Sequence, residues 1–255
     1  IRFGVAGGRG MNALERTRER FTTTNWADLL ALRDASPEVR RRLTENLITR
    51  YWPSVYAYLR HEGRSREDAA ELTQAFFVEV VLGRSLFERA DASRGRLRAL
   101  LLTALKRFVI DEHRRTHTHR PLITFSDELL AHEESKDVDG EFSTVDQAFE
   151  RRWALALLEE AMRRCEAHFR ESGRPNHWLI FDERVLRPAV SRNDSPPLAV
   201  SASAFGFDSP AMAAAAVQTV KRRLDALLRE VVAETVRGPS SVDDELAAVK
   251  TALRG

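Results

Sequence analysis

Several features that often reveal what a protein does are scarce in this 255-residue chain. It has one cysteine, Cys165, which excludes an internal disulfide framework and any zinc site built from several cysteines. Its longest strongly apolar runs, such as residues 99–105, are far shorter than the roughly 20 residues that cross a bilayer. No charged-then-apolar signal segment opens the chain. We therefore expect a cytoplasmic protein that is stabilised by packing and makes no contact with a membrane.

Motifs for catalysis and cofactor binding are also missing. The sequence contains no glycine-rich phosphate loop, no nucleophile elbow and no HExxH zinc motif. His113 and His117 are four residues apart, a spacing that can bind a metal from one helix face. However, no third ligand is indicated and the neighbouring residues are cationic. The interpretation is a protein that is not an enzyme and that uses no metal and no cofactor.

Charge is distributed unevenly along the chain, although the formal net charge is only +2. Residues 94–120 contain eight Lys or Arg and two acids (8 − 2 = +6), whereas residues 126–150 contain one lysine and nine acids (1 − 9 = −8). The first segment suits a polyanion and the second repels one. Nucleic acid is therefore the first partner to consider.

Hydrophobic periodicity predicts an all-α protein, because apolar residues recur every three or four positions and no stretch shows the alternation of a strand. Gly63 suits a helix end, and Ser65 with Asp68 three residues later suits a helix start. In the first half of the chain we expect helices at residues 26–34, 37–62, 65–82 and 93–117.

An acidic segment separates this first group of helices from a second group. It contains Pro121 and Gly140, and it is interpreted as a linker. Beyond it we expect helices around residues 153–162 and 175–186, followed by a break in the pattern at residues 188–197.

Residues 198–235 have the pattern of a helix-turn-helix. A short helix at 198–205 precedes Gly206 as the turn, and Ser209 with Pro210 then begins a long helix that runs to about residue 235. DNA contacts are expected from Gln218, Lys221, Arg222 and Arg223. The alternative is an alanine-rich packing helix in a bundle. The buried stripe of the long helix is expected at Ala213, Val217, Val220, Leu224, Leu227 and Val231.

These patterns divide the chain into two helical domains joined by an acidic linker. The expected boundaries are a flexible N-terminus at 1–23, a helical domain at 24–118, the linker at 119–146, a helix-turn-helix domain at 147–236 and a tail at 237–255.

Two helices of the first domain carry opposite charge. The helix at 96–115 has an apolar stripe and a polar face rich in arginine, so it can join a core and hold phosphate at once. The helix at 65–82 has an acidic face, which is either a solvated surface or a docking surface for a basic partner helix. The apolar stripe of the basic helix consists of Leu97, Leu100, Leu101, Ala104, Leu105, Phe108 and Val109.

Four segments in this order resemble the extracytoplasmic-function (ECF) group of bacterial sigma factors. They are DAAELTQAFFVEVV, DASRGRLRALLLTALKRFVIDEHRR, RRWALALLEEAM and FGFDSPAMAAAAVQTVKRRLDALLRE. The resemblance covers residues 24–236, and the tail VDDELAAVKTAL resembles that of larger planctomycete and myxobacterial members.

The resemblance implies a region-2-like helical bundle and a region-4-like helix-turn-helix domain. It implies a non-catalytic protein that binds core RNA polymerase, directs it to promoter DNA and helps open the DNA. The residues that it places at the polymerase are Asp68, Glu71, Leu72, Gln74, Phe77 and Glu79. Those at the minus-ten promoter element are Arg94, Arg96, Arg98, Lys106, Arg107, Arg114 and Arg115. Those at the minus-thirty-five element are Gln218, Lys221, Arg222 and Arg223.

The sequence also departs from the family. Positions of the helix-turn-helix that often hold charged residues are here Ser201, Ser203, Ala211, Ala214 and Ala215. One alternative is therefore a polymerase-binding adaptor whose second domain binds a protein, and another is a stand-alone helix-turn-helix regulator. An anti-sigma factor or another regulatory protein is a further expected partner. The amphipathic tail is either a regulatory element or a surface helix that caps the second domain.

Overall fold

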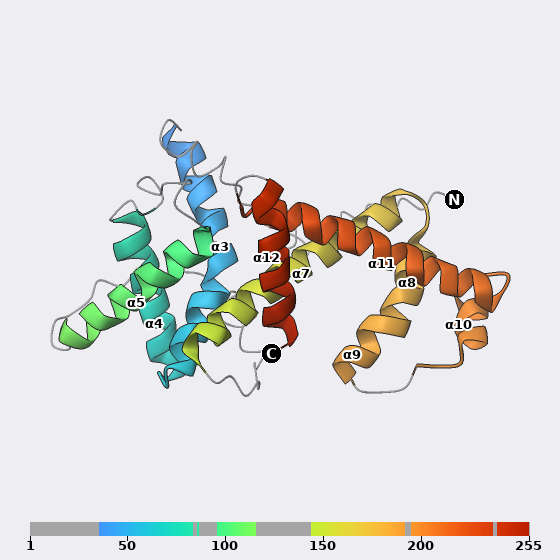
Figure 1. The fold of residues 1–255 in the computed structure, drawn as a ribbon, viewed down its shortest axis with the longest axis horizontal. Helices are drawn as coiled ribbons and strands as arrows, with labels where there is room; N and C mark the ends of the chain where they lie inside the picture. The colour runs from blue at the N-terminus through green and yellow to red at the C-terminus, as the bar shows by residue number, and fades with distance from the viewer. Residues whose placement is uncertain are drawn as a thin grey trace, which may run out of the picture.

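The computed structural model describes residues 36–83, 86, 96–115, 144–191, 195–236 and 239–254. Within these ranges the chain forms helices and no strand, as the periodicity predicts (Figure 1). The predicted helix at 26–34, the predicted N-terminal segment and linker residues 119–143 lie outside the described residues. None of the described helices is both long and apolar enough to cross a membrane.

The first three helices have the predicted positions. Helix α3 (Pro37–His61) ends at Glu62, and Gly63 follows with φ +90°. Helix α4 (Arg66–Phe76) begins after Ser65, whose Oγ accepts a hydrogen bond from the Asp68 amide at 3.0 Å. It continues as a π-helical segment, η1 (Phe77–Leu82), and helix α5 (Leu97–Arg115) comes next in the described chain.

An aromatic cluster joins α3, α4 and α5. The Trp52 ring stacks on Phe77, and Phe76 meets both Phe77 and Phe108 edge to face, with centroid distances of 5.4–5.9 Å. All four rings are buried. The predicted stripe of α5 is confirmed, because five of its members are buried and Leu100 and Ala104 are partly buried.

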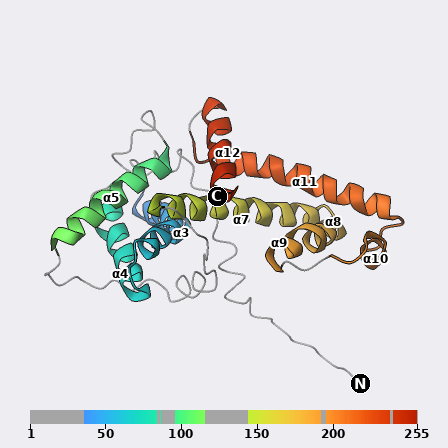
Figure 2. The same cartoon turned by 60° about the horizontal axis from the view of Figure 1, so that its bottom comes forward.

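Helix α7 (Val145–Glu171) is the longest element and lies against both halves of the molecule (Figures 1 and 2). Its N-terminal part packs with α3, and its C-terminal part packs with α11. Helix α7 begins at residue 145, so the last two residues of the predicted linker, 145 and 146, are helical, and the predicted domain boundary stays a prediction. Its start is a capping box, in which Thr144 Oγ1 accepts from the Gln147 amide and the Gln147 side chain accepts from the Thr144 amide. This signal in the sequence was overlooked.

The next helices run on without the predicted interruption at Pro188. Helix α8 (Pro175–Phe181) continues through a π-helical segment, η3 (Asp182–Leu186), into helix α9 (Arg187–Ser191). Proline lacks the amide of an α-helical hydrogen bond and clashes with the preceding turn. Pro188 is nevertheless the second residue of α9, directly after the wider turn of η3, and the described helix continues to Ser191.

The two helices predicted around Gly206 are confirmed. Helix α10 (Leu198–Ala204) is followed by Gly206 with φ +73°, a conformation that glycine adopts without strain. Helix α11 (Pro210–Ala233) begins after Ser209, whose Oγ accepts from the Met212 amide at 3.2 Å. The predicted stripe of α11 is buried except for Leu224, which is partly buried. A second buried row, which the sequence analysis missed, consists of Ala216, Leu228 and Val232.

Helix α12 (Pro239–Arg254) crosses α7 and contacts α11, between the two halves of the molecule (Figure 1). Val242, Leu246 and Val249 are buried in this contact. The amphipathic tail is therefore part of the same core as the rest of the chain. Inside that core, burial raises the pKa of the Cys165 thiol to about 11, so this side chain is a neutral packing residue.

Candidate nucleic-acid and polymerase interface

Of the six residues predicted to contact the polymerase, four are at the surface and two are buried in the core. Asp68 and Glu71 are exposed on α4, and Gln74 and Glu79 are half-buried. We call these four residues the acidic surface. Leu72 is 6% exposed and Phe77 is fully buried, so both hold α4 and η1 on the core. A direct polymerase contact by these two residues stays a prediction, while in the structure they pack in the core, where Phe77 stacks on Trp52 of α3.

Two arginines on α5 form an open cationic face. Arg107 and Arg114 are exposed and lie two helical turns apart on the side where Ile110 is also 51% exposed. Within the described part of the chain neither arginine forms an ion pair. We call Arg107 and Arg114 the arginine pair. Their charge is available to an anionic ligand.

The other predicted minus-ten cations have different surroundings. Lys106 is 44% exposed in its side chain, and its Nζ lies 2.5 Å from Asp146 Oδ2 on α7. Arg115 is the last residue of α5. Arg94 lies outside the described residues. An ion pair this exposed contributes little to stability, so Lys106 can exchange partners readily.

Arg98 is enclosed by residues from three helices. Its side chain is 11% exposed, its Nε donates to Glu245 Oε1 at 2.8 Å, and it also pairs with Glu150. The guanidinium carbon lies 4.7 Å from the ring centroid of Trp153. Burial disfavours the charged form, but the hydrogen bonds and charges of the two carboxylates outweigh it and raise the pKa of Arg98. In this arrangement Arg98 is not open to DNA.

Arg96 shares one of the same carboxylates. Its Nε lies 2.9 Å from Glu245 Oε2, and an Nη lies 3.7 Å from Asp244. Sequence reasoning missed Glu150, Trp153 and Glu245 as neighbours of these arginines. No local signal marks them, since Glu245 and Arg98 are 147 residues apart.

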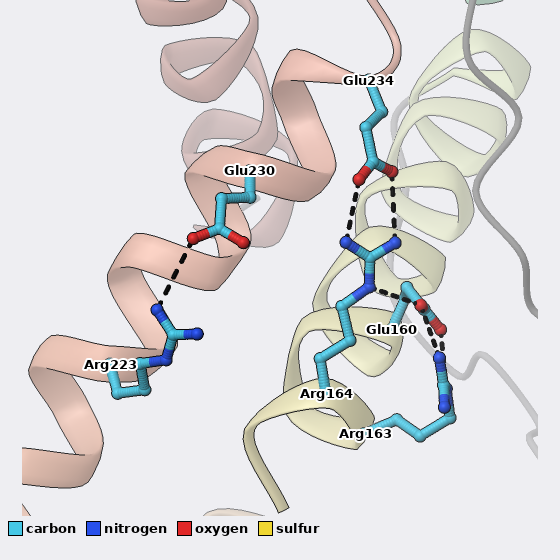
Figure 3. A network of polar contacts seen from close by, with 6 residues as sticks. All are labelled: Glu160, Arg163, Arg164, Arg223, Glu230 and Glu234. Carbon is cyan, nitrogen blue, oxygen red and sulfur yellow. Dashed lines mark hydrogen bonds and ion pairs between the residues drawn. The ribbon is translucent and has the colours of Figure 1, made fainter. Parts of the chain in front are cut away.

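The second candidate surface belongs to α10 and α11. Gln218, Lys221 and Arg222 are exposed, as DNA contacts must be. Arg223 is 36% exposed in its side chain and lies 3.5 Å from Glu230, one of the contacts in Figure 3. The first two turns of α11 instead expose small or apolar side chains, namely Ala211, Met212, Ala214 and Ala215.

A polar network fixes the C-terminal end of α11 on α7 (Figure 3). The Arg164 guanidinium lies 2.8 Å from Glu160 of its own helix and 2.8 Å from Glu234, the residue that ends α11. Glu160 also accepts two hydrogen bonds from Arg163. These contacts hold the long helix in place and leave its N-terminal part outside the network.

His113, the histidine of α5, contacts an arginine and a glutamate in the described part of the chain. His113 Nε2 lies 2.9 Å from an Arg64 nitrogen and 3.8 Å from Glu62, and His117 lies outside the described residues. Among the residues that the structure describes, no group of three His, Cys, Asp or Glu side chains is placed to hold a metal.

Comparison with known proteins gives one family for part of the chain. Residues 47–118 match the family model of sigma-70 region 2. Neither the curated proteins nor the solved structures gave a match. The matched stretch includes both the acidic surface and the arginine pair. Residues 47–118 are thus similar to sigma-70 region 2, the part with which a sigma factor binds RNA polymerase and the minus-ten promoter element.

Proposed function

We propose that this chain is a sigma factor of the ECF group, which binds core RNA polymerase in the cytoplasm, directs it to promoters and helps open the DNA. The observation that carries the proposal is the division of charge within the region 2 domain. The acidic surface is on α4 and η1, whereas the arginine pair is on α5. One domain therefore offers separate contacts for a basic protein surface and for a polyanion.

The acidic surface is the proposed polymerase contact. Asp68, Glu71, Gln74 and Glu79 supply carboxylates and an amide on successive turns, and basic side chains of a partner helix can pair with them. Leu72 and Phe77 contribute indirectly, because their burial keeps the two helical segments in place. This contact stays a prediction.

The arginine pair is the proposed contact to the opened minus-ten strand. Its cations neutralise successive phosphates, which is the main source of affinity for single-stranded DNA. The exposed Ile110 between them can contact an unstacked base. The buried stripe on the other side of α5 anchors this surface to the core.

For the second half we propose that α10 and α11 act as a helix-turn-helix at the minus-thirty-five element. In this proposal Gln218 contacts a base, and Lys221 and Arg222, which are exposed, contact phosphates. The exposed apolar turns at the start of α11 favour a second candidate, an adaptor in which this surface binds a protein. Footprinting of the upstream element in the polymerase complex distinguishes the two, because protection there excludes the pure adaptor.

The test has two steps. The DNA that the complex of the protein and core polymerase binds is first identified by sequencing. That DNA then serves as the template for transcription by core polymerase with the purified protein. Wild type should give promoter-dependent transcripts. The double variant Arg107→Glu, Arg114→Glu should still bind core polymerase but lose at least about tenfold in open complexes detected by permanganate, because each reversed charge repels a phosphate.

The matched control is Arg42→Glu with Arg170→Glu, which reverses two exposed arginines outside the sigma-70 region 2 match. It should open DNA as wild type does. A wild-type protein that fails to bind core polymerase contradicts the proposed function. Joint loss of polymerase binding and opening in the α5 variant contradicts the assignment of separate surfaces. Tight duplex binding in gel shifts without polymerase would support a stand-alone regulator.

A further inference from the structure

A carboxylate of the C-terminal helix α12 forms ion pairs with two arginines at the start of α5. Glu245 is 1% exposed. Arg98 donates to both of its oxygens, to Oε1 at 2.8 Å and to Oε2 at 3.3 Å, and Arg96 Nε lies 2.9 Å from Oε2. Asp244 lies 3.7 Å from Arg96 and adds a second acid. We call the contact of Glu245 with Arg96 and Arg98 the α12 latch.

In the α12 latch, Glu245 accepts from the same guanidinium N–H groups of Arg96 and Arg98 that would bind a nucleic-acid phosphate. Arginine binds carboxylates and phosphates through the same planar set of N–H groups, so one guanidinium cannot satisfy both in full. The two arginines also lie at the N-terminal end of the helix that carries Arg107 and Arg114. Arg98 lies nine residues before Arg107, about half a turn round the helix, so a strand bound to the arginine pair meets Glu245 where it passes around the start of α5.

Apart from Glu245, α12 is held by apolar contacts and by exposed ion pairs. Its apolar residues Val242, Leu246 and Val249 are buried against α7 and α11, but its other ion pairs are exposed. Asp243 pairs with Arg229 at 2.6 Å, with both side chains at least half exposed, and Lys250 lies 4.0 Å from Asp225. Glu245 supplies the one well-buried polar contact of this short helix among the described residues.

We propose that α12 competes with nucleic acid for the start of α5. In the free chain Glu245 holds Arg96 and Arg98, and a single-stranded DNA bound along α5 replaces the carboxylate with phosphate and releases α12. The inference rests on the proposed function, since it takes α5 as the surface for the opened strand. It makes the C-terminal helix an intramolecular inhibitor of DNA binding.

The first experiment measures binding of a fluorescently labelled single-stranded DNA to the full chain at low salt by anisotropy. Glu245→Gln keeps the size of the side chain and removes its charge, so its affinity should exceed that of wild type by about 5–20-fold, the size of an ordinary coupling between two sites. Asp243→Asn is the matched control. It changes the net charge by the same amount on the same helix, and its affinity should stay within about twofold of wild type.

The second experiment uses only the wild-type protein and does not depend on the folding of a variant. Hydrogen exchange of the α12 amides should become faster when the single-stranded DNA is added, because release of the helix exposes them. Unchanged exchange in α12 on DNA binding overturns the proposal, as does equal affinity of Glu245→Gln and Asp243→Asn. Failure of every variant to bind the DNA overturns it too.

These outcomes are separate from those that decide the proposed function. A protein that binds core polymerase and initiates transcription, but shows no effect of Glu245→Gln on single-strand affinity, remains a sigma factor without a latch. A protein that does not bind core polymerase loses the proposed function, whatever the latch experiments show.

Discussion

Arg98 and Glu150 illustrate how the surroundings of a charged side chain decide its role. By composition and position Arg98 is a typical phosphate contact, yet three helices enclose it and two carboxylates neutralise it. For Glu150, unlike Arg98, the surroundings disfavour the charged form. Burial is the largest influence on it and raises its pKa, although Arg98 acts in the opposite direction.

The raised pKa of Glu150 predicts a pH-dependent effect of Glu150→Gln. The folded wild type binds a proton at this site more readily than the unfolded chain, so the site reduces the free energy of unfolding as the pH rises through the folded pKa. The variant lacks this titration. Its stability relative to wild type should therefore increase between the ordinary pKa of 4.5 and neutral pH, by less than about 1 kcal/mol because the group is partly exposed.

Urea denaturation at both pH values measures this change. Asp243→Asn serves as the control, since Asp243 is exposed and should show no comparable gain. A relative loss of stability in Glu150→Gln at neutral pH would show that attraction to Arg98 outweighs burial and that the stated sign is wrong.

At the scale of single elements, capping residues were the most dependable signals. Ser65 and Ser209 each accept the predicted amide hydrogen bond at the start of a helix. Such bonds form within three residues, so the local sequence is enough to predict them. The same logic applies to Thr144 and Gln147, where the signal was present but lay inside a segment dominated by acidic residues.

Ser209→Ala should lower the free energy of unfolding by about 1 kcal/mol. The variant leaves the Met212 amide without the hydroxyl acceptor at the start of α11. Chemical denaturation followed by circular dichroism measures the loss. Ser203→Ala is the matched control, because Ser203 is exposed on α10 and its side chain caps no helix. Equal stability of the two variants would argue against a capping role for Ser209.

Two other features of the elements were not accessible from local patterns. The π-helical segments η1 and η3 follow ordinary helical sequence, and the first begins at Phe77 within a run of apolar residues. Pro188 looked like a helix breaker and is instead part of α9. Phe77, Val80 and Val81 of η1 are buried in the core, whereas η3 has no buried residue, so packing accounts for the first segment alone.

The whole molecule is organised by α7, which contributes to the core of both halves. Trp153 is buried near Arg98, and Cys165, three turns later, lies beside the backbone of α11. One cluster of buried apolar residues extends from Leu47 to Val249. The predicted division at residue 147 therefore remains a prediction about the sequence pattern, while the described helices share a continuous core.

A continuous core predicts that the described part of the chain unfolds in one cooperative transition. Tryptophan fluorescence and far-ultraviolet circular dichroism should give the same midpoint in urea. Trp178→Phe removes the probe in α8 and leaves Trp26, Trp52 and Trp153, so the difference from wild type reports on the second half. The transitions should coincide before and after the substitution. Separate midpoints would show that the halves fold independently.

The sequence alone determined the helices, most of their ends, the buried stripe of α5 and the exposure of Arg107, Arg114, Lys221 and Arg222. These depend on periodicity and on contacts a few residues apart. Only the tertiary structure decided that Leu72 and Phe77 are covered, and that Arg96 and Arg98 face Glu245 of α12. The physical reason is that burial and ion pairing depend on which distant helices meet, and no local pattern specifies a partner 147 residues away.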